Sequence, residues 1–224
     1  MNIKGKVVLI TGGARGIGKA TAKLFALEGS KIIICSRNKE ELDDTCKEIL
    51  SAGGDCLAIE CDIKKSSDVK NLVQKSINKY GHIDILINNA GTGYYKLLLE
   101  TTEEEWNETI DTNLKGVFLL CKECIPYIKK GIIINISSGA GKKGLPRFSA
   151  YCASKFGVIG LTESFVEEFQ FIKFYALCPG PVDTKLFRDN FHYSPPGKPE
   201  EIARIIIDLS RREYLKSGES LVIS

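Results

Sequence analysis

The chain has 224 residues, of which 43% are hydrophobic and 26% are charged, and its formal net charge is +3. These proportions are those of an ordinary globular protein and exclude a disordered chain. Charges of both signs are interleaved and no apolar run approaches a membrane span, so we expect neither nucleic-acid nor membrane partners. The first apolar run is also too short for a signal peptide, which favours a cytoplasmic location.

Short apolar runs alternate with longer helical patterns along the whole chain. The runs are apolar throughout, which is typical of parallel strands covered by helices on both faces. This pattern predicts one doubly wound α/β domain over residues 1–224, with a seven-stranded parallel Rossmann sheet. Residues 185–198 have no clear period and are expected to form a loop that acts as a substrate lid. The expected strands are residues 6–10, 31–35, 56–60, 83–88, 131–137, 173–178 and 220–223, and the expected helices are 16–28, 39–52, 66–79, 103–127, 149–170 and 199–211.

A glycine-rich turn, "TGGARGIG", joins the first expected strand to the first expected helix. Glycines at 12, 16 and 18 let the backbone approach a pyrophosphate, which the free amides of a helix N-terminus stabilise. Their spacing is Gly-x3-Gly-x-Gly rather than the usual Gly-x-Gly-x-x-Gly. The context between strand and helix favours a nucleotide site over a structural turn.

The segment after the second expected strand indicates which nucleotide binds. An NAD-binding protein commonly carries an acidic residue there for the ribose 2′-hydroxyl, whereas this chain has Ser36 and Arg37. A hydroxyl and a guanidinium, with Arg15 as a second cation, suit a 2′-phosphate, so NADP(H) is favoured over NAD(H). The alternative is that both arginines are solvated surface charges. The missing acidic residue also argues against a methyltransferase with a similar sheet.

Tyr151 and Lys155 are four residues apart on an expected helix and therefore share one face. An ammonium beside a phenol lowers the pKa of the phenol and makes it a usable acid and base at neutral pH. Ser137 and Ser138 end an apolar strand, at the edge of the sheet where open α/β folds bind ligands. The competing interpretation of the Tyr and Lys spacing, a surface helix pair, loses weight because these groups converge.

The eight cysteines lie mostly in apolar segments and are expected to be reduced and buried. Cys121 and Cys124 form a CxxC within a helical pattern that has no second convincing pair, so a packing role is favoured over a metal or redox role. The two histidines, His82 and His192, lie far apart in sequence. No metal site is predicted.

Several motifs in order resemble the short-chain dehydrogenase/reductase family, above all its 3-oxoacyl-ACP reductase-like members. The resemblance covers essentially the whole chain. The motifs are "TGGARGIG" at 11–18, "CDI" at 61–63, "NNAG" at 88–91, "TNLKG" at 112–116, Ser138 with "YCASK" at 151–155, and "CPGPVDT" at 178–184.

The resemblance implies an NADP-dependent oxidoreductase that interconverts a carbonyl and a secondary alcohol by hydride transfer. Tyr151 would be the general acid and base, Lys155 would hold the nicotinamide ribose and depress the pKa of the tyrosine, and Ser138 would bind the substrate oxygen. Asn113 would hold a water that returns protons to Lys155. Asn88 keeps a merely structural interpretation. The cofactor-binding residues implied are Gly12, Arg15, Gly16, Ile17, Gly18, Ser36, Arg37, Asp62, Ile63, Asn89, Ala90, Gly91, Tyr151, Lys155, Pro181, Val182 and Thr184.

The helices at 103–127 and 149–170 resemble those of family dimers, which implies a homo-oligomer, a dimer or a tetramer. Two other functions stay open: a catalytically idle NADP-binding regulatory protein, and an NAD(P)-dependent epimerase or dehydratase. Filled catalytic positions argue against the first, and the lack of room for a larger substrate domain argues against the second. An apolar carbonyl substrate is expected, although the pocket aromatics are equally suited to packing. The expected pocket lining is residues 139–146, Tyr94, Tyr95, Phe187, Phe191, His192 and Tyr193.

Overall fold

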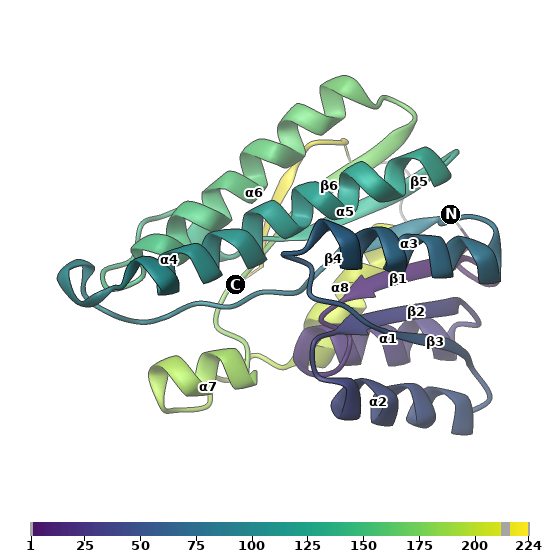
Figure 1. Ribbon diagram of the computed structural model, residues 1–224, viewed down its shortest axis with the longest axis horizontal. Coiled ribbons are helices and arrows are strands. Elements are labelled where there is room, and N and C mark those ends of the chain that lie inside the picture. The colour runs from purple at the N-terminus through teal and green to yellow at the C-terminus, as the bar shows by residue number, and fades with distance from the viewer. Residues whose placement is uncertain (1, 212–215, 224) are drawn as a thin grey trace.

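The computed structural model describes residues 2–211 and 216–223. These residues form one seven-stranded sheet in which all neighbouring strands are parallel, in the order β3-β2-β1-β4-β5-β6-β7 (Figure 1). The predicted doubly wound sheet is therefore confirmed. The strands are β1 (Val7–Thr11), β2 (Lys31–Ser36), β3 (Asp55–Glu60), β4 (Ile85–Asn88), β5 (Gly131–Ile136), β6 (Ile172–Pro179) and β7 (Ser220–Ile223).

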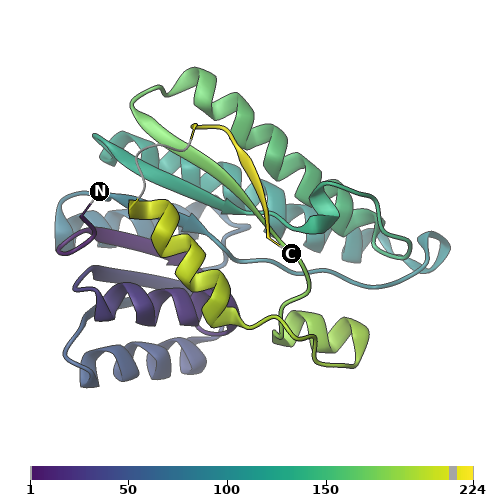
Figure 2. The same ribbon diagram turned by 180° about the vertical axis from the view of Figure 1, so that it is seen from behind.

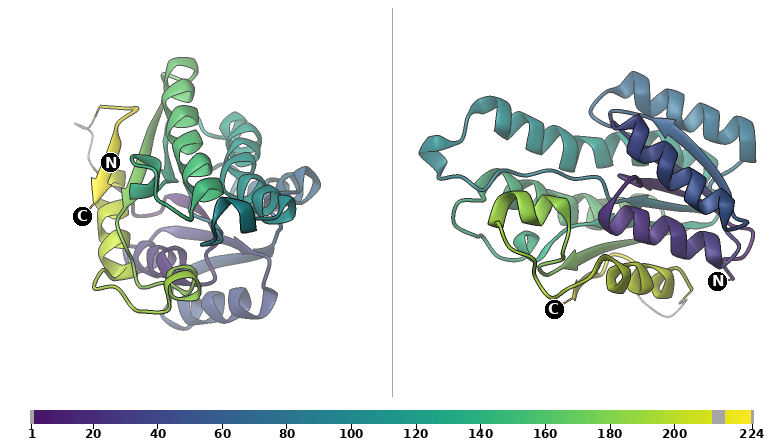
Figure 3. Two further views of the ribbon diagram at one scale, coloured as in Figure 1. Left: turned by 90° about the vertical axis from the view of Figure 1, so that its left-hand side faces the viewer. Right: turned by 90° about the horizontal axis from the view of Figure 1, so that it is seen from below.

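Two layers of helices cover the sheet. Helices α1, α2 and α8 pack on one face, where α8 crosses in front of the strands in Figure 2, and α3, α5 and α6 pack on the other. The last strand, β7, lies at the edge of the sheet and is drawn in yellow in Figure 3. The helices are α1 (Gly16–Leu27), α2 (Lys39–Ser51), α3 (Ser66–Tyr80), α4 (Glu103–Ile110), α5 (Gly116–Cys124), α6 (Ser149–Glu168), α7 (Lys185–Phe191) and α8 (Pro199–Arg211).

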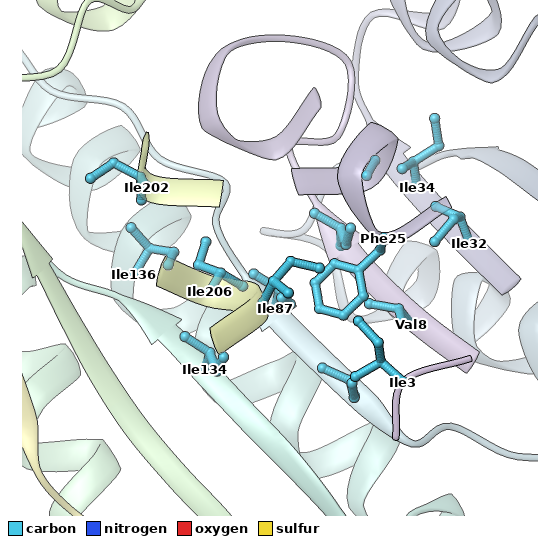
Figure 4. Packing of buried hydrophobic residues seen from close by; sticks show 14 of the residues in the cluster. Ile3, Val8, Phe25, Ile32, Ile34, Ile87, Ile134, Ile136, Ile202 and Ile206 are labelled. Atoms are coloured by element: carbon cyan, nitrogen blue, oxygen red, sulfur yellow. The ribbon is translucent and has the colours of Figure 1, made fainter. Parts of the chain in front are cut away.

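The apolar strand runs become the core between these layers. Phe25 of α1 and Ile206 of α8 meet the isoleucines of the central strands, and both are fully buried (Figure 4). Consecutive residues of β1 and β2 are buried on both faces, as the unbroken apolar runs predict. Such burial stabilises the sheet by about 25 cal/mol per Å² of apolar surface. No helix within the described ranges has both the length and the apolarity needed to cross a membrane.

The helix predicted over residues 103–127 is interrupted in the structure. A π-helical segment, Asp111–Lys115, separates α4 from α5. A 3-10 turn, Ile125–Tyr127, follows α5. The backbone N–H of Gly116 donates to the carbonyl of Asp111, five residues earlier, which is the π-helical spacing. Hydrophobic periodicity does not distinguish this single wide turn from ordinary helix.

The expectation of a loop over residues 185–198 is wrong for its first half, because residues 185–191 form the helix α7. The Thr184 hydroxyl caps the helix by accepting a hydrogen bond from the N–H of Phe187 at 3.3 Å. An ion pair between Lys185 and Asp189, at 2.7 Å, links successive turns. The helix ends at His192, which has a left-handed φ of 57°. Seven residues are too few for a helical period to be visible in the sequence.

Candidate active site

The glycine turn after β1 approaches the chain that leaves β4. The order of the sheet reverses between these strands, which is where open α/β sheets bind ligands. A Cβ atom on Gly12 would lie 3.0 Å from the Cα of Ala90, and one on Gly18 would lie 2.2 Å from the carbonyl oxygen of Gly12. Gly12 and Gly16 also have positive φ angles of 64° and 55°. These positions therefore require glycine for close backbone contact.

Thr11 and Asn89 hold the two turns together. The Thr11 hydroxyl accepts hydrogen bonds from the N–H groups of Asn89 and Ala90, both at 3.0 Å. The Asn89 amide donates to the Thr11 carbonyl at 2.8 Å. Within the described chain, no side chain caps the N-terminus of α1. The first amides of that helix are thus left for an anionic ligand.

A cavity of about 1060 Å³ runs along the carboxyl edge of the sheet from these turns to α6. It is lined by every predicted site residue except Gly18 and Asn113, which lie behind its wall. Gly18 acts by packing under the turn, and Asn113 is 1% exposed. The predicted residues in the lining are Gly12, Arg15, Gly16, Ile17, Ser36, Arg37, Asp62, Ile63, Asn89, Ala90, Gly91, Ser138, Tyr151, Lys155, Pro181, Val182 and Thr184.

The groups predicted to bind a 2′-phosphate gather at the β2 end of this cavity. The Ser36 hydroxyl donates to the carbonyl of Asn38 at 3.0 Å. The Arg37 guanidinium contacts Glu108 at 2.7 Å, and Arg15 lies 3.7 Å from Glu41. Both arginine side chains remain more than half exposed. Sequence reasoning placed the arginines at the cavity but did not foresee their acidic partners.

Ser138 and Tyr151 both line the cavity, Ser138 after the end of β5 and Tyr151 in the first turn of α6. Ser138 follows the end of β5, and its hydroxyl accepts a hydrogen bond from the N–H of Ala140 at 3.1 Å. Burial raises the pKa of Tyr151 to about 12, although the Ser138 hydroxyl acts in the opposite direction. The expected lowering of this pKa is therefore wrong for the chain alone.

The position of Lys155 explains why it does not lower the pKa of Tyr151 in the chain alone. Its ammonium donates to the carbonyl of Ile136 at 2.8 Å and lies 5.4 Å from the centroid of the Tyr151 ring. The side chain is 4% exposed, and burial lowers its own pKa to about 8. The lysine is thus close to the tyrosine but directed toward the end of β5.

The low pKa of Lys155 predicts a stability effect that depends on pH. The unfolded chain keeps this proton up to its ordinary pKa of 10.5, and the native chain releases it near 8, so stability rises with pH between these values. We expect the unfolding free energy of the wild type, relative to Lys155→Met, to increase by about 2 kcal/mol from about pH 7 to about pH 10. Urea denaturation at both pH values measures this. A difference that stays constant with pH would contradict the assignment.

Asn113 lies in the π-helical segment and ties it to the loop after β4. Its amide donates to the carbonyl of Thr92 at 2.8 Å and to the hydroxyl of Ser154 at 3.0 Å, and its oxygen accepts from the N–H of Thr92 at 2.8 Å. Both amide protons are thus used within the protein. The side chain positions this loop beside Lys155, and the water expected at Asn113 stays a prediction.

The neighbouring Thr112 was not predicted as a site residue. It lines the cavity, and among the described residues its buried hydroxyl oxygen has no hydrogen-bond partner. The motif that identified Asn113 also contains Thr112, but nothing in the sequence indicated that this hydroxyl would lack a partner. A buried polar atom of this kind is satisfied when a bound molecule contacts it.

Asn88 has the structural role that was favoured for it. Its amide donates to the Asn135 side chain at 2.8 Å, and Asn135 in turn donates to Thr162 at 2.9 Å. This buried chain of polar groups joins β4, β5 and α6. All eight cysteines are buried thiols, and burial raises the pKa of Cys121 to about 12. Such a thiol is inert, which agrees with packing.

Comparison with known proteins decides the family. The short chain dehydrogenase family model matches residues 6–194. The chain belongs to the short-chain dehydrogenase/reductase family. It is therefore an oxidoreductase of the class that interconverts carbonyls and alcohols with NAD(P)(H).

Individual relatives of this short-chain dehydrogenase/reductase cover nearly all of it. A 3-oxoacyl-[acyl-carrier-protein] reductase of Thermotoga maritima is 39% identical over 229 residues, covering 95% of this chain and 93% of its own. One of Synechocystis sp. is 36% identical over 216 residues, covering 90% and 87%. Among solved structures, a short-chain type dehydrogenase/reductase from Mycobacterium marinum has a TM-score of 0.94 at 29% identity, covering 100% of this chain and 95% of that one. An alcohol dehydrogenase from Thermococcus sibiricus, complexed with 5-hydroxy-NADP, has a TM-score of 0.91 at 29% identity, covering 97% and 95%.

The structure of this family member fits a dinucleotide. Glycine backbone at the turn leaves no room for side chains, the amides of α1 have no side-chain cap among the described residues, and Thr112 lines the same cavity. The cavity thus offers N–H donors for an anion, close approach to the backbone, and polar side chains. The residues present would hold a pyrophosphate at the α1 end and a ribose beside Lys155.

Aromatic residues line the cavity around Tyr151 and α7. Phe148 stacks on Tyr151 with ring centroids 4.5 Å apart, and Phe191 of α7 meets Phe148 edge-on at 5.6 Å. Phe187 and Tyr193 also line the cavity, as predicted. Phe148 was missed, because a single aromatic residue before a helix carries no distinguishing pattern.

Part of the expected substrate lining is corrected. The described residues that line the cavity do not include Tyr94, Tyr95 or His192. Tyr95 packs its ring against Phe148 and Phe191 instead, and His192 ends α7. Within residues 139–146, the lining is formed by Gly139, Ala140, Lys143 and Leu145.

One side chain joins α7 to the loop after β4. The oxygen of Asn190 accepts a hydrogen bond from the N–H of Tyr95 at 2.8 Å, and its amide donates to the carbonyls of Gly93 at 3.1 Å and Leu186 at 2.8 Å. Helix α7 is thereby held against the loop after β4. This contact spans more than 90 residues of sequence, so local patterns did not reveal it.

Proposed function

We propose that the protein is an NADP-dependent reductase that interconverts a carbonyl and a secondary alcohol, with Tyr151 as general acid and base. The observation that carries this proposal is the convergence of Ser138, Tyr151 and Lys155 on the wall of a cavity whose other end has the glycine turn. Bound NADPH would supply the hydride. Arg15 and Arg37 lie at the β2 end of the cavity, which would hold the adenosine and is called the adenosine end below. These two arginines support NADP(H) over NAD(H).

The side chains divide the remaining work between them. The Ser138 hydroxyl would donate a hydrogen bond to the substrate oxygen as negative charge develops there. The Tyr151 phenol, which keeps its proton at neutral pH, would transfer that proton to the same oxygen during reduction. Lys155 would hold the nicotinamide ribose, and Asn113 would keep the adjacent loop in place. Phe148 and Phe191 would exclude water from the reacting atoms.

The substrate is proposed to be apolar around its carbonyl group, because aromatic rings and Leu145 line that end of the cavity. Two relatives named as 3-oxoacyl-[acyl-carrier-protein] reductases support a 3-oxoacyl thioester as the first compound to test. The eight reduced thiols support a cytoplasmic location. Exposed aromatic residues on α4, α5 and α6, namely Trp106, Phe118 and Phe156, support a homo-oligomer built on these helices.

A substrate panel tests the proposal. The purified protein is mixed with NADPH or NADH and with a 3-oxoacyl thioester, an activated ketone or a secondary alcohol, and the absorbance of the reduced nicotinamide is followed. We expect reduction of at least one carbonyl compound and a higher kcat/KM with NADPH than with NADH. Equal use of both cofactors, or better use of NADH, would overturn the NADP assignment. Tight NADP binding without any turnover would favour an idle regulatory protein.

A further inference from the structure

Every arginine at the adenosine end of the cavity already has an acidic partner in the described part of the chain. Arg37 of the β2–α2 connection contacts the Glu108 carboxylate, with Nη1 and Oε1 2.7 Å apart. Arg15 of the glycine turn lies 3.7 Å from Glu41 of α2, measured between Nη1 and Oε2. The two cations expected to bind a 2′-phosphate therefore belong to ion pairs.

Glu108 is held more firmly than an ordinary surface carboxylate. Its second oxygen binds the ammonium of Lys64, and its side chain is only 22% exposed. Burial opposes ionisation, but hydrogen bonds from Lys64 and Arg37 bring the pKa of Glu108 below its ordinary value. The carboxylate is therefore charged at neutral pH. Because Glu108 lies on α4, it approaches the site from a distant part of the sequence.

Within this network of ion pairs the charges cancel. Arg15, Arg37 and Lys64 are three cations, and Glu41, Glu108 and Asp62 are three anions, with Asp62 3.7 Å from Lys64. A 2′-phosphate brings close to two negative charges at neutral pH, which the guanidinium groups attract and the carboxylates repel. A ribose 2′-hydroxyl brings none, so the carboxylates affect the two cofactors unequally.

We infer that Glu41 and Glu108 restrict the preference for NADP(H) over NAD(H), by competing with the 2′-phosphate for Arg15 and Arg37. This inference rests on the proposed function, because it requires a dinucleotide in the cavity. Glu41 and Glu108 are cofactor-specificity residues, and their removal converts a neutral site into a positive one. A purely positioning role for Glu108, in which it holds Arg37 ready for the phosphate, makes the opposite prediction.

Calorimetric titration with NADP⁺ and NAD⁺ tests the inference by binding alone. The variants are Glu41→Gln, Glu108→Gln and the double variant. Glu40→Gln and Glu103→Gln are matched controls, because they remove the same charge from the first turns of α2 and α4 outside the cavity lining. We expect NADP⁺ to bind about tenfold more tightly to the double variant and NAD⁺ to change by less than about twofold. The gain should shrink at high salt.

Each other outcome has a definite meaning. An unchanged or weaker NADP⁺ affinity in the double variant, with the controls folded, overturns the inference. Glu41 lies on an exposed turn, so Glu41→Gln stays informative if loss of the Lys64 contact unfolds the Glu108 variant. A wild type that binds NAD⁺ more tightly overturns the NADP proposal, while a selective gain for NADP⁺ in the variants still supports the inference. Failure of both dinucleotides to bind overturns both.

Discussion

Replacement of Tyr151 by phenylalanine is expected to lower carbonyl reduction by at least about 1000-fold, because the proposed proton donor is removed while the ring remains. The ring carries the stacking contact with Phe148, with centroids 4.5 Å apart, and this contact does not need the hydroxyl. Binding of NADPH should therefore change by less than about threefold. Initial rates and a calorimetric titration of the same preparation measure the two quantities.

A matched control is Tyr127→Phe, which removes a phenol from the exposed turn before β5, outside the cavity lining. This variant should keep the wild-type rate. Activity of Tyr151→Phe within tenfold of the wild type would show that another group supplies the proton. Loss of NADPH binding as well would show that the phenol acts mainly in cofactor binding.

The second large effect is expected from Gly18→Ala. The added methyl group would lie 2.2 Å from the carbonyl oxygen of Gly12 and 2.5 Å from the side-chain nitrogen of Asn89, so the backbone of the turn must move. We expect the unfolding free energy to fall by about 3 kcal/mol and NADPH affinity to fall at least about tenfold. Denaturation curves and dinucleotide titration measure both.

Gly160→Ala provides the comparison for this prediction. Gly160 lies within α6, and a Cβ atom added there meets nothing within 4 Å. Alanine is the better helix former by about 1 kcal/mol, so this variant should be slightly more stable than the wild type. Equal behaviour of the two glycine variants would mean that the turn after β1 tolerates a side chain, contrary to its geometry.

The features predicted correctly from the sequence are those with local signals. Unbroken apolar runs such as 7–10 identify buried parallel strands, because covering on both faces leaves no polar side. The glycines at 12 and 16 identify the turn, because only glycine adopts its positive φ at low cost. Tyr151 and Lys155 are placed on one helix face by their spacing alone.

The features that were missed depend on contacts between distant segments. Arg37 and Glu108 are 71 positions apart, so the sequence around Arg37 cannot indicate that its charge is balanced. The same is true of Lys155, whose direction is set by the carbonyl of Ile136. A pKa depends on such partners and on burial more than on residue type, which explains why the pKa of Tyr151 is raised in the chain alone.

The contact of Asn190 with the loop after β4 connects α7 to the Tyr151 ring. The carbonyl that accepts from Asn190 belongs to Gly93, and a Cβ atom at Gly93 would lie 2.7 Å from the Tyr151 ring. A shift of α7 would therefore reach this ring through the backbone of Gly93. We expect the orientation of the phenol to depend on the Asn190 side chain, so a change made on α7, far away in the sequence, would alter the alignment of residue 151.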